Sequence, residues 1–161
     1  DLDFSLLKPV AFKEFELVIK KITGRVPEAT IKEIYDKKYT LFAKIMFAVN
    51  FKPISIGVKI EINKEIKQVE HELHLLTSPF NNIEVIGNVF SLEQILKDKL
   101  YLIDTRHEPR DLFDAWYVSQ KLGIPFKISK SQKYSKKELM DSLNPFIPIS
   151  LKKTLSLFEK A

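Results

Sequence analysis

Several segments of the first 90 residues either alternate apolar and polar residues or are rich in β-branched and aromatic residues, which is typical of β-strands. The pattern predicts strands over residues 1–5, 39–51, 55–63, 69–77 and 83–90. The second and third strands are separated by a short connection, so we expect an antiparallel hairpin. Residues 9–24 instead have helical spacing, with Pro9 in the first turn and Gly24 at the end. Residues 27–38 fit either a short helix or an irregular strand. Gly87 within the last strand indicates a bulge or a tight turn.

The spacing of apolar residues becomes helical after residue 90. Ser91 is a candidate N-cap, with Gln94 three residues later as in a capping box. Pro109 suits the first turn of a second helix, which is expected to end at Gly123. The side chains expected to face the core from this second helix are Leu112, Phe113, Trp116 and Tyr117. Two shorter helices are predicted over residues 136–143 and 149–159.

These elements predict an α+β protein with a mixed β-sheet core over residues 1–90 and a helical region over residues 91–161 that packs on it. A length of 161 residues, 45% hydrophobic and 29% charged, is ordinary for a globular protein. The net charge of +5 favours polyanionic partners such as nucleotides or RNA. The absence of cysteine excludes disulfides and thiolate metal sites. With neither a signal peptide nor an apolar run of membrane-spanning length, we expect a cytoplasmic protein without a membrane partner.

The first predicted strand carries two carboxylates, Asp1 and Asp3, which alternation places on one face. Two residues of strand rise separate them by roughly 7 Å, close enough for both to reach one cation. Mg²⁺ prefers carboxylate oxygens of this kind. A second strand offers Glu61, with Lys59 on the same face. If the two strands are neighbours, the three carboxylates form an acidic cluster beside a lysine that suits phosphate.

A purely structural interpretation of these carboxylates is also open, because an acid-x-acid pair on a strand is most often a solvated face. The chain begins at Asp1, directly on the acidic motif and without a methionine. We therefore expect that residues precede it in the natural protein.

In the first helix of the second region, Lys99 interrupts an apolar stripe between Leu96 and Ile103. A lysine at such a position needs an anionic partner or an exit to solvent. Asp111 falls in the first turn of the next helix, where the helix dipole favours an acidic residue.

Three blocks of the sequence together resemble a known family. The segment S-L-E-Q-I-L-K-D-K-L at residues 91–100, followed by Arg106 and by R-D-L-F-D at 110–114, resembles a signature of the AbiEii/AbiGii-type nucleotidyltransferase toxins. These toxins belong to the DNA polymerase β-like superfamily. The opening D-L-D-F-S resembles their metal-binding motif, and V-K-I-E-I at 58–62 resembles their third acidic strand. The order and spacing of the blocks agree over residues 1–122.

The resemblance implies transfer of a nucleoside monophosphate from an NTP to an acceptor hydroxyl, with loss of pyrophosphate. Asp1, Asp3 and Glu61 would hold two Mg²⁺ ions, as in other two-metal sites. The residues implied in catalysis are Asp1, Asp3, Glu61, Lys99 and Asp111. The residues implied in nucleotide or phosphate binding are Ser5, Lys59, Lys99 and Arg110. Asp111, or else Asp114, matches the acidic residue of the last motif and would orient the lysine or the nucleotide.

The same resemblance implies the partners. The acceptor would be a tRNA end or a protein, and a cognate antitoxin would neutralise the toxin. The sequence departs from the family in two respects: the family's Gly-Ser or Gly-Gly turn upstream of the D-x-D is absent, and the third acid is Glu61 rather than aspartate. The departures leave a second interpretation open, a catalytically silent module of the same fold that binds nucleotide, RNA or protein. A metal-dependent phosphohydrolase would need a water-activating group near the acidic cluster, which the sequence does not offer.

Overall fold

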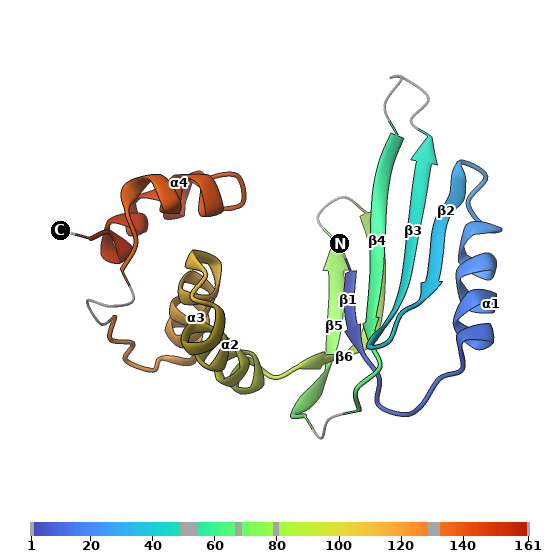
Figure 1. Ribbon diagram of the computed structural model, residues 1–161, viewed down its shortest axis with the longest axis horizontal. Helices are drawn as coiled ribbons and strands as arrows, with labels where there is room; N and C mark the ends of the chain where they lie inside the picture. Colours follow the sequence, from blue (N-terminus) through green and yellow to red (C-terminus); the bar gives the residue numbers. More distant parts are fainter. Residues whose placement is uncertain (1, 49–54, 67–68, 79–80, 129–132, 161) are drawn as a thin grey trace. The chain divides into compact units, whose positions relative to one another are not determined.

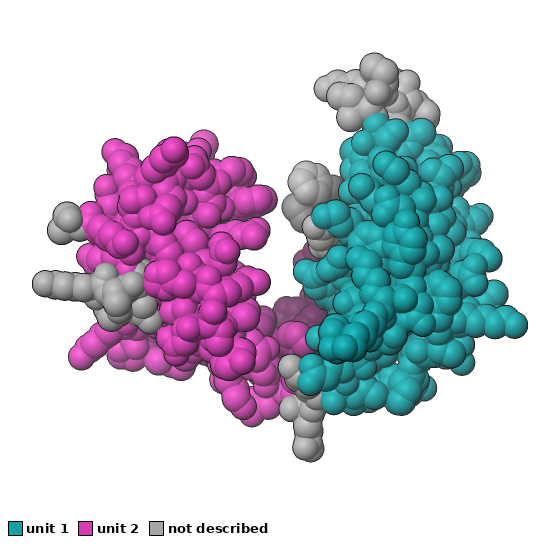
Figure 2. Space-filling model, in the orientation of Figure 1, with its two compact units in different colours: residues 1–68 teal, residues 69–161 magenta. Residues whose placement is uncertain are grey.

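The computed structural model describes residues 2–48, 55–66, 69–78, 81–128 and 133–160 (Figure 1). The chain is a mixed α+β protein that divides into two compact units, residues 1–68 and 69–161 (Figure 2). We expected the division at residue 90. By compactness, the hairpin before that position groups with the helices that follow it. No helix among the described residues is long and apolar enough to cross a membrane.

The first unit is a mixed four-stranded sheet in the order β1-β4-β3-β2 (Figure 1). Its strands are β1 (Leu2–Ser5), β2 (Ala29–Asp36), β3 (Thr40–Ala48) and β4 (Ser55–Asn63). The expected antiparallel pairing of β3 with β4 is confirmed, and β2 also pairs antiparallel with β3. The ambiguous segment after α1 is therefore the strand β2, with a register shift between Ile31 and Glu33. Strand β1 runs parallel to its neighbour β4.

Helix α1 (Phe12–Thr23) covers one face of this sheet. Its buried residues Phe15 and Ile19 are four apart and pack on Leu41, Ile45 and other apolar side chains of the strands. The helix begins at Phe12, so the prediction of Pro9 in its first turn is wrong. Gly24 does end the helix, but with φ −66°, a conformation open to any residue.

The second unit opens with a hairpin of β5 (His71–Ser78) and β6 (Asn81–Phe90). The bulge predicted at Gly87 is wrong: Gly87 pairs regularly with His74, and the register shifts instead between Leu76 and Ser78. The glycine leaves room for a neighbour, because a Cβ at this position would lie 3.1 Å from Leu76 Cδ1.

Helices α2 (Leu92–Arg106) and α3 (Pro109–Leu122) follow. As expected, the Ser91 hydroxyl caps α2 by accepting a hydrogen bond from the Gln94 N–H. The Gln94 side chain does not complete a capping box; its oxygen accepts from the Glu70 N–H, which ties the helix to the segment before β5. Helix α3 starts with Pro109 and ends at Gly123 in the left-handed conformation, φ +68°, as its sequence predicts.

The chain ends with α4 (Lys136–Leu143) and the 3₁₀ helix η2 (Ile149–Phe158). Ser135 and Glu138 form a capping box at the start of α4. Phe158, which is fully buried, packs with Leu112 and Phe113 of α3 in the core of this unit. Tyr117 was expected in that core but is 38% exposed, with its ring stacked on Phe113.

Candidate functional site

The parallel pairing of β1 with β4 brings two of the predicted metal-ligating residues together. Asp3 is the register partner of Glu61. Neighbouring strands lie about 5 Å apart, and side chains at paired positions point to the same face. The two carboxylates therefore stand side by side on the face opposite the one that α1 covers, because Ile60 faces the core.

Two further predicted residues share this face of the first unit. Ser5 lies two residues after Asp3, and Lys59 two residues before Glu61, so alternation places all four on one face. The third predicted carboxylate, Asp1, lies outside the described residues. Among the residues that the structure describes, no group of three or more His, Cys, Asp and Glu is placed to hold a metal ion.

The other predicted site residues lie in the second unit, around a buried carboxylate on α3. The Asp111 side chain has 0% exposure. Arg106 donates from Nε to Oδ2 at 2.5 Å and from Nη2 to Oδ1 at 2.9 Å, a two-pronged pair. Lys99 Nζ donates to the same Oδ1 at 3.0 Å. As the sequence predicts, Asp111 lies in the first turn of α3, but its complete burial and its pairing with Arg106 were not predicted.

Lys99 links this buried carboxylate to a second one. Its Nζ lies 2.6 Å from Asp114 Oδ2, and its side chain is 24% exposed. The sequence predicted that Lys99 needs either an anionic partner or an exit to solvent, and in the described part of the chain it pairs with two carboxylates, Asp111 and Asp114. Both candidates for the last acidic motif, Asp111 and Asp114, therefore contact the predicted phosphate-binding lysine. We name Lys99, Arg106, Asp111 and Asp114 the α2–α3 ion network.

The network favours the charged states of Asp111 and Lys99. Burial opposes the charge of Asp111, but hydrogen bonds from Arg106 and Lys99 outweigh it and lower the pKa of this carboxyl. Burial likewise opposes the charge of Lys99, while Asp114 and Asp111 outweigh it and raise the pKa of the ammonium. Close to the network, burial raises the pKa of Tyr134 to about 12.

The structure places two arginines of the quoted signature in different surroundings. Arg110, predicted to bind phosphate, is exposed and lies over the ring of Phe146 at 5.7 Å. Arg106 had no assigned role and is the main partner of Asp111. The signal for it was already present, since Arg106 belongs to the quoted signature and stands five residues before the acid. The break between the helices hid the pairing.

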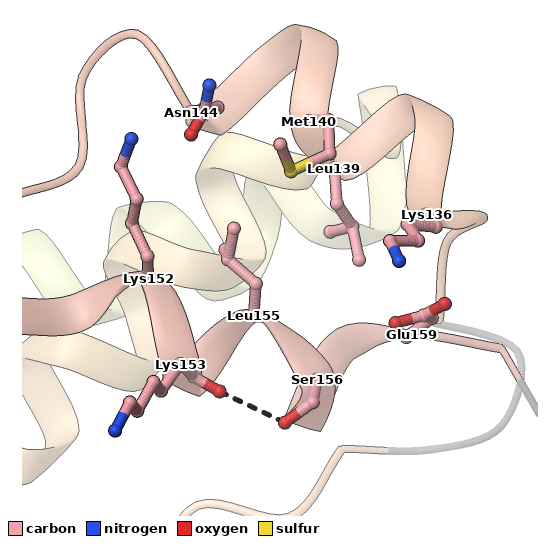
Figure 3. Close-up of a pocket in the computed structure, with 9 residues that line it drawn as sticks. All are labelled: Lys136, Leu139, Met140, Asn144, Lys152, Lys153, Leu155, Ser156 and Glu159. Atoms are coloured by element: carbon pink, nitrogen blue, oxygen red, sulfur yellow. Dashed lines mark hydrogen bonds between the residues drawn. The ribbon is translucent and has the colours of Figure 1, made fainter. Parts of the chain in front are cut away.

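A pocket of about 250 Å³ lies in the second unit between α4 and η2 (Figure 3). Leu139 of α4 and Leu155 of η2 line its apolar part. Lys152 and Lys153 line it from η2, where Ser156 donates a hydrogen bond to the Lys153 carbonyl at 3.0 Å. Local sequence patterns do not indicate this pocket, because its walls come from two separate helices that pack together.

Comparisons with known proteins give little guidance. No protein-family model matches the chain, and no curated protein matches it. The crystal structure of JHP933 from Helicobacter pylori is similar over 97% of this chain, with a TM-score of 0.49 and 16% sequence identity. This chain spans 60% of JHP933. A likeness of this size assigns no function.

Proposed function

We propose that this chain is a Mg²⁺-dependent nucleotidyltransferase with a polymerase β-like core, which transfers a nucleoside monophosphate from an NTP to an acceptor hydroxyl. The observation that carries the proposal is the register pairing of Asp3 with Glu61 on neighbouring parallel strands. This pairing brings together two sequence motifs that lie 58 residues apart, and their order and spacing resemble those of the toxin family. We call the pair Asp3 and Glu61 the acidic edge. Asp1 is the third proposed ligand.

The residues of this edge fit the metal. Carboxylate oxygens are the ligands that Mg²⁺ prefers, and it commonly binds through one or two of them together with substrate phosphates. Bound there, two Mg²⁺ ions would neutralise the triphosphate and make the acceptor oxygen more nucleophilic. That oxygen forms a bond to the α-phosphorus while the bond to pyrophosphate breaks, and the hydroxyl proton passes to water. Ser5 and Lys59, on the same face, are the proposed contacts to the nucleotide.

The α2–α3 ion network supplies a second part of the proposal. An ammonium has three donors, and Asp111 and Asp114 accept from two of them. We propose that Lys99 contacts a phosphate oxygen through its third donor, with Asp111 as the positioning residue. Arg106 keeps Asp111 ionised and fixed. Arg110, an exposed residue in the first turn of α3, is the remaining proposed phosphate contact.

The proposed acceptor is a tRNA end, with a protein as the second candidate, and the proposed role is that of a toxin held in check by a cognate antitoxin. The net charge of +5 supports an RNA acceptor.

Incubation of the protein with each labelled NTP, Mg²⁺ and total tRNA tests the proposal. We expect label on tRNA with the wild type and none with Asp3→Ala. Glu33→Gln is the matched control, because Glu33 is a carboxylate of the same sheet, on β2, and should retain transfer. Transfer that survives Asp3→Ala would reject the assigned site. NTP binding without transfer to RNA or protein would favour the silent binding module.

A further inference from the structure

The positive charge of the chain is concentrated at one end. Residues 124–161 contain eight lysines and three acidic residues, a net charge of +5, which equals that of the whole chain. The preceding 123 residues are therefore neutral overall. The lysines themselves are spread along the sequence, so the concentration becomes visible only when the acidic residues are counted with them. This end holds α4, η2 and the pocket between them.

The pocket combines cationic side chains with an apolar wall. Lys136 lines it from the first turn of α4, and Lys152 and Lys153 line it from η2. Its apolar wall includes Leu139 and Met140 (Figure 3). Lysines suit phosphate oxygens, and apolar side chains suit the flat face of a base.

Polar side chains of the pocket fit the rest of a nucleotide. Asn144 offers both donors and acceptors, and Ser156 and Glu159 offer acceptors. A base edge or a ribose 2′-hydroxyl pairs with groups of this kind. Glu159 disfavours a bare phosphate in contact with it, but it suits the amino group of a base.

We propose that the α4–η2 pocket holds one nucleotide of a single-stranded RNA segment, with Lys152 and Lys153 on the flanking phosphates. Sequence-tolerant reading of an unpaired strand needs these elements: cations along the backbone and a concave apolar surface for a base. Phe146, which is exposed and held under Arg110, lies two residues beyond Asn144 and offers a stacking surface for a neighbouring base. The identification of this RNA strand as the acceptor rests on the proposed function, whereas RNA binding in the pocket does not.

Binding of a short fluorescein-labelled single-stranded RNA, measured by anisotropy over a series of salt concentrations, tests the lysines. We expect the double variant Lys152→Ala, Lys153→Ala to bind roughly tenfold more weakly. Its plot of log affinity against log salt should be shallower by about 1.4, which corresponds to two lost phosphate contacts on a single strand. The matched control is Lys13→Ala, Lys21→Ala, two exposed lysines of α1, which removes the same charge and should bind like the wild type.

A neutral variant tests the pocket itself. Ser156 is exposed and lines the pocket, so Ser156→Phe fills the space without changing the charge. We expect it to weaken RNA binding while the thermal unfolding midpoint stays close to that of the wild type. Met140→Ala, on the other wall, should weaken binding by a smaller factor through lost contact with the base.

Several outcomes would overturn the inference. These are a wild type that does not bind RNA, equal losses in both lysine doubles, and unchanged binding by Ser156→Phe and Met140→Ala. Tighter binding to phosphatidylserine vesicles than to RNA would also overturn it. RNA binding that depends on the pocket in a protein that transfers no nucleotide would support the inference while the proposed function fails.

Discussion

Arg106 and Asp111 lie on either side of the break between α2 and α3, and two guanidinium nitrogens bond both oxygens of the buried carboxylate. Between them, His107 takes the left-handed conformation, with φ 52°. That conformation disfavours a residue with a Cβ by about 1–2 kcal/mol, so the pair is formed against local backbone preference. Lys99 bonds the same carboxylate from within α2, and the network therefore holds the two helices together.

Loss of the buried carboxylate should destabilise the second unit. We expect Asp111→Asn to lower the free energy of unfolding by about 2–3 kcal/mol, because the amide cannot satisfy both cations. Asp114→Asn is the matched change on the same lysine, and its side chain is 44% exposed. It should cost below about 1 kcal/mol. Urea unfolding, followed by the fluorescence of Trp116, measures the free energy of unfolding of both variants. An equal decrease in the two would contradict the role assigned to Asp111.

Acid should weaken the same contact. The pKa of Asp111 is lowered in the folded protein, so its contribution to stability is complete above the unfolded value of about 3.9. As the pH falls below that value, the unfolded chain takes up the proton first, and the contribution is lost as the pH reaches the lower folded pKa. We expect the stability gap between wild type and Asp111→Asn to narrow over this range. A gap independent of pH between about 6 and 3 would show that the carboxylate charge is not responsible.

The acidic edge should bind a divalent cation. With Mn²⁺ as the probe, paramagnetic resonance should show binding that is weakened at least tenfold in Asp3→Asn and in Glu61→Gln, since each removes one carboxylate ligand. Asp3 is exposed, so Asp3→Asn should change the free energy of unfolding by no more than about 0.5 kcal/mol. Glu33→Gln should leave Mn²⁺ affinity unchanged. Equal affinity in all three variants would remove the metal site from this edge.

The two glycines that end helices should respond differently to alanine. Gly123 has φ +68° and open space around its Cβ position, so Gly123→Ala should cost about 1 kcal/mol through backbone strain alone. Gly24 has φ −66°, and a Cβ there would lie 3.2 Å from the Lys20 carbonyl oxygen and 4.0 Å from that of Lys21. We expect a smaller change there. Thermal unfolding of the two variants compares them, and a larger loss for Gly24→Ala would contradict this account.

Elements with a clear local signal were well predicted. Pro109 and Gly123 frame α3, Ser91 caps α2, and α4 covers the predicted residues. The errors arose at residues whose type is compatible with more than one local structure. Pro9 and Gly87 have ordinary local uses, in a helix start and a bulge, which long-range packing does not require here.

For the candidate sites as well, the local pattern predicted part of the arrangement and contacts between distant segments decided the rest. Alternation in β1 and β4 was enough to place Asp3 with Ser5, and Glu61 with Lys59, on one face of their own strands. Only strand pairing decided that Asp3 stands beside Glu61, because register is set by contacts between distant segments. Likewise, the interrupted apolar stripe indicated that Lys99 needs a partner or an exit to solvent. The packing of α2 against α3 places Asp111 and Asp114 beside it.

The sequence by itself determined the α+β composition, most helix boundaries and the residue types able to hold metal or phosphate, because these depend on neighbours a few residues away. The tertiary structure decided which carboxylates meet, that Asp111 is buried under Arg106, and that α4 and η2 enclose a pocket with three lysines. These relationships depend on chain segments that pack across the fold. Their energy comes from burial and long-range pairing, which local periodicity does not encode.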